Sequence, residues 1–223
     1  MSKKIIRRNV DHDHSCLFSS VAYLTDRVNF NEESSKKYRK LIVDYILNNE
    51  VEDSCLMIFD DLGFHPNETS EFVSNKQKYI ETIAKSNTWG GQNEMEIFCI
   101  LFDIQICVAD ENTGEIYKIG GDQKENRIYI LWTNGGTHYD PLVINDDTAD
   151  SSTDMTSFKT NDEDTYNKVK EFIKNINQEE KYDLHTVNLL CKNCNQIFIG
   201  KAAAMIHAND ESYEGDHTNF KKV

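Results

Sequence analysis

Cys16 is the first residue of this chain whose type and surroundings suit it for chemistry. It follows two Asp-His pairs in DHDHSCLF, where a polar loop meets a run with helical spacing. The N-terminus of a helix offers free amides and a positive dipole end, which favour a thiolate and can bind an oxyanion. Asp13 can brace this loop by accepting backbone N–H bonds. The simpler interpretation of Cys16 is a small apolar residue that opens a core helix.

A cysteine nucleophile needs a histidine base that is distant in sequence and close in space. Of the seven histidines, His12 and His14 adjoin the cysteine, and we interpret them as solvated or loop-bracing. His138 is the better candidate because it follows a glycine turn in NGGTHYDPLVI and opens a predicted strand. Asp140 lies two residues further on the same face of that strand, where it can orient the imidazole.

A second group of chemically capable residues lies near the end of the chain. Cys191 and Cys194 form a C-x-x-C pair, and twelve residues separate Cys194 from His207. This spacing is typical of a zinc finger with two cysteines and two histidines. The candidates for the fourth ligand are His217, Asp210 and His185.

The elements that must position these residues follow from hydrophobic spacing. Helical spacing predicts helices over 17–24, 35–49, 66–84 and 93–103. Strand patterns cover 104–110, 116–120, 127–133 and 137–144. Helices followed by a small sheet predict an α+β fold.

The composition changes after residue 146. The segment DDTADSSTDMTSFKTNDEDT is rich in Asp, Ser and Thr and offers little that can be buried. We therefore predict a catalytic domain over 1–146, an acidic Ser/Thr-rich linker and helix over 147–182, and a zinc finger over 183–223.

The bulk composition excludes several classes of protein. The 223 residues carry 24 Lys and Arg against 38 Asp and Glu, a net charge of −14, which disfavours nucleic acid as a partner. The mean hydropathy is −0.61, and the longest apolar run is too short for a signal peptide or a membrane span. We expect a cytoplasmic protein with no membrane insertion, whose six cysteines are reduced.

Three motifs in order, DHSCLF, WGGQNEMEI and GGTHYDPL, resemble the ovarian tumour (OTU) family of deubiquitinating cysteine proteases. The C-x-x-C tail narrows the resemblance to the branch in which a zinc finger follows the OTU domain and which works in ER-associated degradation. The resemblance runs from about Arg8 to the C-terminus. It implies a papain-like fold, with helices around a small central sheet, and a small C-terminal zinc finger.

The resemblance also implies roles for single residues. Cys16 would be the nucleophile and His138 the general base, with Asp13 and Asp140 as the supporting carboxylates. The zinc would be structural and held by Cys191, Cys194, His207 and His217.

Three loops, at 10–16, 86–96 and 133–138, would surround the tail of ubiquitin. The implied substrate-binding residues are Val10, His14, Ser15, Trp89, Gly90, Gly91, Glu94, Gly135, Gly136 and Thr137. The branch usually has Asn where this chain has His14, which can titrate near neutrality and alter the pH profile.

The implied activity is hydrolysis of the isopeptide bond between the C-terminal glycine of ubiquitin and a lysine, with ubiquitin and polyubiquitin as partners. The alternative is a catalytically inactive ubiquitin-binding adaptor, which the joint presence of Cys16, His138 and Asp13 disfavours. The branch also docks on the valosin-containing AAA ATPase through a ubiquitin-like domain. Only about seven residues precede the match here, so either this chain is a short relative or that domain lies beyond this sequence, and we expect recruitment to the ATPase only in the second case.

Overall fold

The computed structural model describes residues 3–49, 76–133, 136–146, 150–186, 188–199, 201–208 and 220–222. The chain forms two compact units, Met1–Glu171 and Phe172–Val223. The predicted boundary at residue 146 therefore lies inside the first unit. Within the described ranges, no helix has both the length and the apolar character needed to cross a bilayer.

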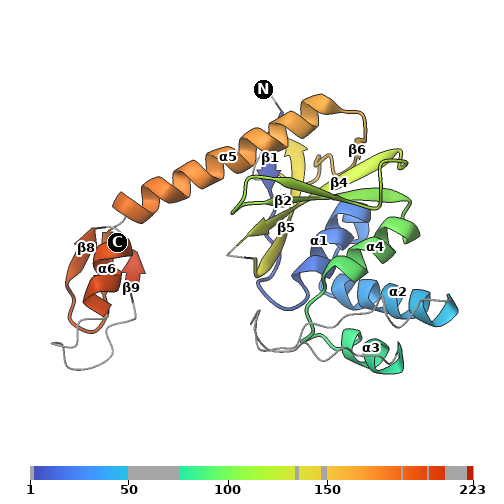
Figure 1. Ribbon diagram of the computed structural model, residues 1–223, viewed down its shortest axis with the longest axis horizontal. Helices are drawn as coiled ribbons and strands as arrows, with labels where there is room; N and C mark the ends of the chain where they lie inside the picture. The colour runs from blue at the N-terminus through green and yellow to red at the C-terminus, as the bar shows by residue number, and fades with distance from the viewer. Residues whose placement is uncertain are drawn as a thin grey trace. The chain divides into compact units, whose positions relative to one another are not determined.

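A mixed sheet of six strands forms the centre of the first unit (Figure 1). Its strands are β1 (Lys4–Arg7), β2 (Ile104–Asp110), β3 (Ile116–Ile119), β4 (Asn126–Thr133), β5 (His138–Asn145) and β6 (Phe158–Lys159). The order is β1-β5-β4-β2-β3, and β6 pairs with β4 beside this path. The β2–β4 pair is parallel, and the other pairs are antiparallel.

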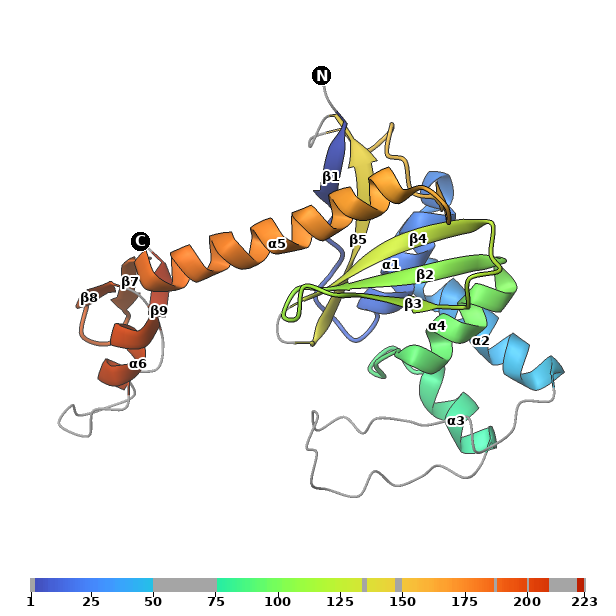
Figure 2. The ribbon, with the colours of Figure 1, turned by 45° about the horizontal axis from the view of Figure 1, so that its top comes forward.

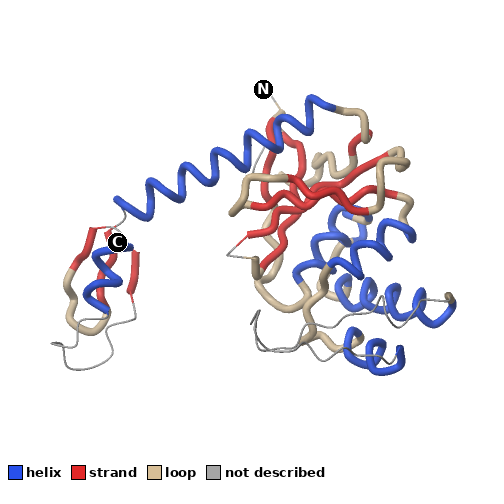
Figure 3. The backbone as a smooth tube through the Cα atoms, viewed as in Figure 1, coloured by secondary structure: helices blue, strands red, loops and turns tan. Residues whose placement is uncertain are grey.

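Four helices lie on one side of this sheet (Figure 3). They are α1 (Cys16–Thr25), α2 (Ser34–Asn48), α3 (Lys76–Ile83) and α4 (Gln92–Leu101), and a short 3₁₀ helix, η1 (Arg27–Asn29), follows α1. The first turns of α5 (Glu163–Thr186) lie on the other side, where the Arg127 guanidinium is 5.7 Å from the ring centre of Tyr166. The sheet is thus covered on both faces.

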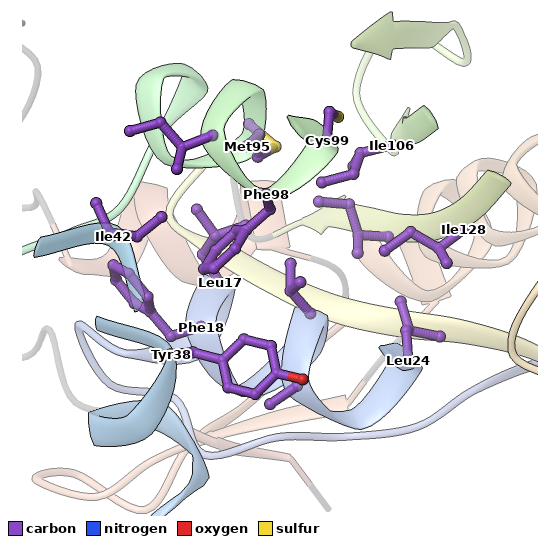
Figure 4. Packing of buried hydrophobic residues seen from close by; sticks show 14 of the residues in the cluster. Leu17, Phe18, Leu24, Tyr38, Ile42, Met95, Phe98, Cys99, Ile106 and Ile128 are labelled. Atoms are coloured by element: carbon purple, nitrogen blue, oxygen red, sulfur yellow. The ribbon is translucent and has the colours of Figure 1, made fainter. Parts of the chain in front are cut away.

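The main core fills the space between the sheet and helices α1, α2 and α4 (Figure 4). Every residue of β2 is buried, because both of its faces are covered. Each large apolar side chain buried in this way contributes about 1.5–3 kcal/mol. The labelled side chains are Leu17, Phe18 and Leu24 of α1, Tyr38 and Ile42 of α2, Met95, Phe98 and Cys99 of α4, Ile106 of β2 and Ile128 of β4.

The α+β class predicted from the sequence is confirmed. The helices expected at 17–24, 35–49 and 93–103 and the four expected strands are present, with ends shifted by one or two residues. Of the helix expected at 66–84, the described part is α3, and residues 50–75 lie outside the described ranges. The strands β1 and β6 were not predicted.

The acidic segment after β5 differs from the predicted solvated linker. Asp154 is 8% exposed, and its carboxylate accepts hydrogen bonds from Arg8 Nε at 2.8 Å and Asn145 Nδ2 at 2.6 Å. The backbone of Met155 pairs with that of Ile144 in both directions. A polar segment can be buried when charged partners satisfy its groups, and its composition alone does not reveal those partners.

The described part of the second unit contains the later turns of α5, a small antiparallel sheet and a short helix (Figure 2). Its strands are β7 (Asn188–Cys191), β8 (Ile197–Ile199) and β9 (Phe220–Lys222), in the order β8-β7-β9. The helix α6 (Lys201–Ala208) follows β8. This arrangement brings the end of β7 and the end of α6 together.

Candidate active site and metal centre

Cys16 is the first residue of α1 and is only 1% exposed. Asp13 shapes the loop before it, because its Oδ1 accepts the N–H of Ser15 at 2.7 Å. The carbonyl oxygen of Asp13 accepts the N–H of Cys16 at 3.3 Å. The carboxylate of Asp13 therefore braces the cysteine loop.

His138 is the first residue of β5 and is 3% exposed. Its Nε2 lies 3.0 Å from Oδ1 of the fully buried Asp140. The same carboxylate accepts the N–H of Val10 at 2.9 Å and the Nε–H of Arg7 at 2.7 Å. Asp140 is thus fixed by three donors and holds the plane of the imidazole.

The other ring nitrogen of His138, Nδ1, is also buried and has no hydrogen-bond partner among the described residues. If Nε2 donates its proton to Asp140, then Nδ1 carries a lone pair. This atom is therefore the one available to accept a proton from a nucleophile.

Helix α1 brings Cys16 to the beginning of β5. The Cys16 sulfur is hydrogen-bonded to the backbone of Tyr139, the residue after His138. One turn along the helix, Ser20 Oγ donates to the carbonyl oxygen of Tyr139 at 2.9 Å. The candidate nucleophile and the candidate base are therefore neighbours in space.

Burial raises the pKa of the Cys16 thiol to about 11, although backbone hydrogen bonds from Tyr139 and Leu17 oppose the shift. The thiol is therefore protonated at neutral pH in this state. Attack on a carbonyl then requires a base that removes the proton as the substrate reacts.

Two ring contacts join the cysteine loop to the other loops. The imidazole of His12 stacks on that of His138, with ring centres 4.4 Å apart and planes 18° apart. The rings of His14 and Trp89 meet edge to face, with their centres 5.1 Å apart. The two histidines that we interpreted as solvated or bracing thus contact the loops around Cys16.

The glycines of the second and third loops occupy tight positions. A Cβ on Gly90 would lie 2.8 Å from the side chains of Leu17 and Phe18. Gly136 has φ +91°, and its Cβ would lie 2.9 Å from Trp132. The backbone of Gly136 therefore favours glycine, and a side chain at Gly90 would displace Leu17 or Phe18.

The remaining loop glycines and Thr137 are placed as follows. Gly91 is the N-cap of α4. Thr137 is exposed and donates its N–H to the carbonyl oxygen of Thr133 at 3.2 Å. Gly135 lies outside the described residues.

Two of the predicted substrate-binding residues lie inside the protein instead. Ser15 is 3% exposed, and its Oγ accepts a hydrogen bond from Arg39 at 3.0 Å. Glu94 is 3% exposed, where it accepts the Gly91 N–H at 2.7 Å and bonds the hydroxyl of Tyr79. Burial raises the pKa of Glu94. The Ser15 hydroxyl is tied to Arg39 and so fixes the cysteine loop. The Glu94 carboxylate lies three residues into α4 and caps the N-terminus of that helix.

Arg39 of α2 is a structural residue of the site that the sequence analysis missed. It is 2% exposed, and its guanidinium donates to the carbonyl oxygens of His14 at 2.9 Å and Thr88 at 2.6 Å. A third bond reaches the carbonyl oxygen of Ile83 at 3.0 Å. Burial lowers the pKa of Arg39 to about 10, so the side chain remains a cation at neutral pH. Arg39 thus joins the cysteine loop to the loop that carries Trp89.

Arg7, which holds Asp140, was also missed. A signal existed for Arg39, because Ile42 and Ile46 lie three and seven residues further along the buried stripe of the same helix. Arg7 gave no such signal, because its role depends on the pairing of β1 with β5, which are far apart in sequence.

The second unit contains a compact group of Cys191, Cys194 and His207, whose ligand atoms all lie within 4.8 Å of one another. Cys194 Sγ and His207 Nε2 are 3.3 Å apart. Burial disfavours the Cys191 thiolate, but hydrogen bonds from Cys194, Asn193 and His207 outweigh it and lower the Cys191 pKa to about 6. Two thiolates and one imidazole suit zinc.

The fourth zinc ligand stays a prediction. His217 and Asp210 lie outside the described residues, and the side chain of His185 is likewise not described.

The sequence also matches a known protein family. The model of the OTU-like cysteine protease family matches residues 11–139, more than half of the chain. The chain belongs to the OTU family of cysteine proteases. The OTU match includes Cys16 and His138 and ends before Asp140 and before the cluster of Cys191, Cys194 and His207.

Relatives of this OTU protein match almost the whole chain, and each is named "Ubiquitin thioesterase OTU1". The protein from Dictyostelium discoideum is 30% identical over 221 residues, 97% of this chain and 62% of its own length. The Homo sapiens protein is 29% identical over 98% of this chain and 58% of its own length. The Xenopus laevis protein is 28% identical, over 98% of this chain and 66% of its own length. The chain thus spans less than two thirds of these relatives.

A solved structure also shares the OTU fold. "Structure of Ovarian Tumor (OTU) domain in complex with Ubiquitin" is 25% identical, with a TM-score of 0.59. The similarity covers 80% of this chain and 90% of that one. The predicted OTU fold is therefore confirmed.

Proposed function

We propose that this protein is a cysteine deubiquitinase that cleaves the isopeptide bond between the C-terminal glycine of ubiquitin and a lysine. One observation carries the proposal: His138 is held at Nε2 by Asp140, its buried Nδ1 has no hydrogen-bond partner among the described residues, and the backbone of the next residue, Tyr139, bonds the Cys16 sulfur. Membership of the OTU family supports it, as do the names of the relatives and the similar OTU domain in complex with ubiquitin.

The proposed mechanism uses the side chains of Cys16, His138 and Asp140. His138 Nδ1 takes the proton of the Cys16 thiol as the sulfur attacks the carbonyl of the terminal glycine. The resulting imidazolium donates this proton to the leaving lysine amine, and a thioester remains on Cys16. Water, activated by His138, then hydrolyses the thioester. The Asp140 carboxylate stabilises the imidazolium at each step.

The oxyanion of the tetrahedral intermediate needs hydrogen-bond donors. The first amides of α1 have no partner within the helix and adjoin Cys16 in the chain. The Cys16 N–H bonds the carbonyl of Asp13 at 3.3 Å, a long bond that substrate can replace. We therefore assign the oxyanion site to the backbone of the cysteine loop.

We also propose a structural zinc ion held by Cys191, Cys194 and His207, with His217 as the fourth ligand. The convergence of three ligand atoms within 4.8 Å supports it. Zinc would replace a hydrophobic core in a unit this small and would take no part in bond cleavage.

The wider setting is also a proposal: a cytoplasmic protein that acts on polyubiquitin in protein quality control, including ER-associated degradation. The alternative function is an inactive ubiquitin-binding adaptor. The raised pKa of Cys16 is the observation that favours this alternative.

Hydrolysis of diubiquitin of each linkage type tests the proposed function. Wild-type protein should release monoubiquitin from at least one linkage, and Cys16→Ala should release none. Cys99→Ala is the matched control, because Cys99 is equally buried and its pKa is also raised to about 11. Binding of diubiquitin by wild type without hydrolysis of any linkage would favour the adaptor.

A further inference from the structure

The cysteine loop places a second imidazole directly against the candidate base. His12 is exposed, whereas His138 beneath it is 3% exposed. The ring centres are 4.4 Å apart, and the planes differ by 18°. His12 therefore covers the ring face of His138, while Asp140 holds its edge at Nε2.

The two contacts restrain different motions of the same ring. The hydrogen bond to Asp140 fixes the position of Nε2 but permits the imidazole to tilt about that bond. A parallel ring on its face opposes this tilt. Since Nδ1 must meet the Cys16 thiol, a tilt of the ring would lengthen the path of proton transfer.

We propose that His12 is a positioning residue of the active site, which stacks on His138 and keeps its Nδ1 directed at Cys16. This inference rests on the proposed function, because it assigns His138 as the base. His14, the other histidine of the DHDH motif, contacts Trp89, so the two histidines have separate tasks.

Three variants separate stacking, size and charge. His12→Ala removes the ring, His12→Gln keeps a polar side chain without a ring, and His12→Phe keeps a ring that cannot be charged. Turnover of a fluorogenic ubiquitin C-terminal amide should fall about 2- to 10-fold in kcat for the first two, with KM nearly unchanged. His12→Phe should retain at least half of the wild-type kcat at pH 8.

The loss in kcat at nearly constant KM, and its rescue by a phenyl ring in His12→Phe, are readouts that a purely structural role would not give. The thermal midpoint should be unchanged in all three, because the side chain is exposed.

Two results would overturn the inference while leaving the proposed function intact. One is a wild-type protein that cleaves the substrate and a His12→Ala variant with the same kcat. The other is a His12→Phe variant as slow as His12→Ala. A wild-type protein that binds ubiquitin but never cleaves it would instead count against the proposed function.

The orientation of the ring can be measured without turnover. In ¹H–¹⁵N spectra of imidazole-labelled protein, the His138 signals, assigned with His138→Ala, should shift when His12 becomes Ala. They should return toward their wild-type positions in His12→Phe. Unchanged His138 signals in His12→Ala would contradict the stacking contact itself.

Discussion

His138 Nε2 and Asp140 Oδ1 lie 3.0 Å apart on the same face of β5, and both side chains are almost fully buried. The second oxygen of Asp140 is held by Arg7 from the neighbouring strand. A buried carboxylate with its lone pairs occupied in this way can serve only as an acceptor for His138. It therefore selects the ring form in which Nδ1 carries the lone pair.

Asp140→Asn should lower kcat by about 10²- to 10⁴-fold with a smaller effect on KM, because an amide at this position no longer selects that form or stabilises the imidazolium. The measurement is turnover of a fluorogenic ubiquitin amide. Asp154→Asn is the matched control, since Asp154 is also a buried aspartate paired with an arginine, Arg8. It should keep kcat within about twofold, and equal losses in both variants would contradict the assigned role.

The raised pKa of Cys16 predicts the pH dependence of its alkylation. Only the thiolate reacts with iodoacetamide, and a pKa of about 11 makes the thiolate a small minority at neutral pH. The rate at Cys16, followed by peptide mass spectrometry, should therefore rise about tenfold per pH unit between pH 7 and 9 without ubiquitin. A plateau below pH 8 would show instead a resting thiolate paired with a cation.

Arg39→Lys should destabilise the first unit by about 1–3 kcal/mol, because the lysine ammonium cannot reach all of the carbonyl oxygens that the guanidinium bonds. Urea unfolding followed by tryptophan fluorescence reports on this unit, since Trp89 and Trp132 both belong to it. Arg27→Lys is the control, because Arg27 makes an exposed bond to a carbonyl oxygen, and it should change stability by less than about 0.5 kcal/mol. Equal effects of the two substitutions would contradict the role of Arg39 in joining the cysteine loop to the loop that carries Trp89.

Purified protein should contain one zinc ion per chain by elemental analysis, and Cys191→Ser should lose it, because a hydroxyl is a poor ligand in place of a thiolate. Cys107→Ser, a buried cysteine in β2 of the first unit, should keep the zinc. His217→Ala tests the fourth ligand by the same analysis. Full zinc content in Cys191→Ser would refute the proposed ligand set.

The sequence predicted those parts of the molecule that local patterns determine. The helix that begins at Cys16, the strand that begins at His138 and the shared face of His138 and Asp140 follow from spacing alone. The three loops came from a family resemblance rather than from physical reasoning. The catalytic roles of these residues stay predictions until rates are measured.

The missed features depend on contacts between distant segments. Arg7 and Arg39 are charged residues, which are usually solvated, and only the pairing of β1 with β5 and the approach of two loops to α2 explain their positions. Asp154 was predicted to be solvated for the same reason, because its partner Arg8 is far away in sequence. The family resemblance assigned Glu94 to substrate binding, but the cap that it forms on α4 places it inside the protein.

The central claim is that Cys16 attacks the C-terminal carbonyl of ubiquitin. The most direct test is to mix the reduced protein with ubiquitin that carries a C-terminal electrophile and to measure its intact mass. We expect a mass increase of one ubiquitin, mapped to Cys16, present in Cys99→Ala and lost in Cys16→Ala. A folded wild-type protein that gains no mass, or an adduct on another cysteine, would contradict it.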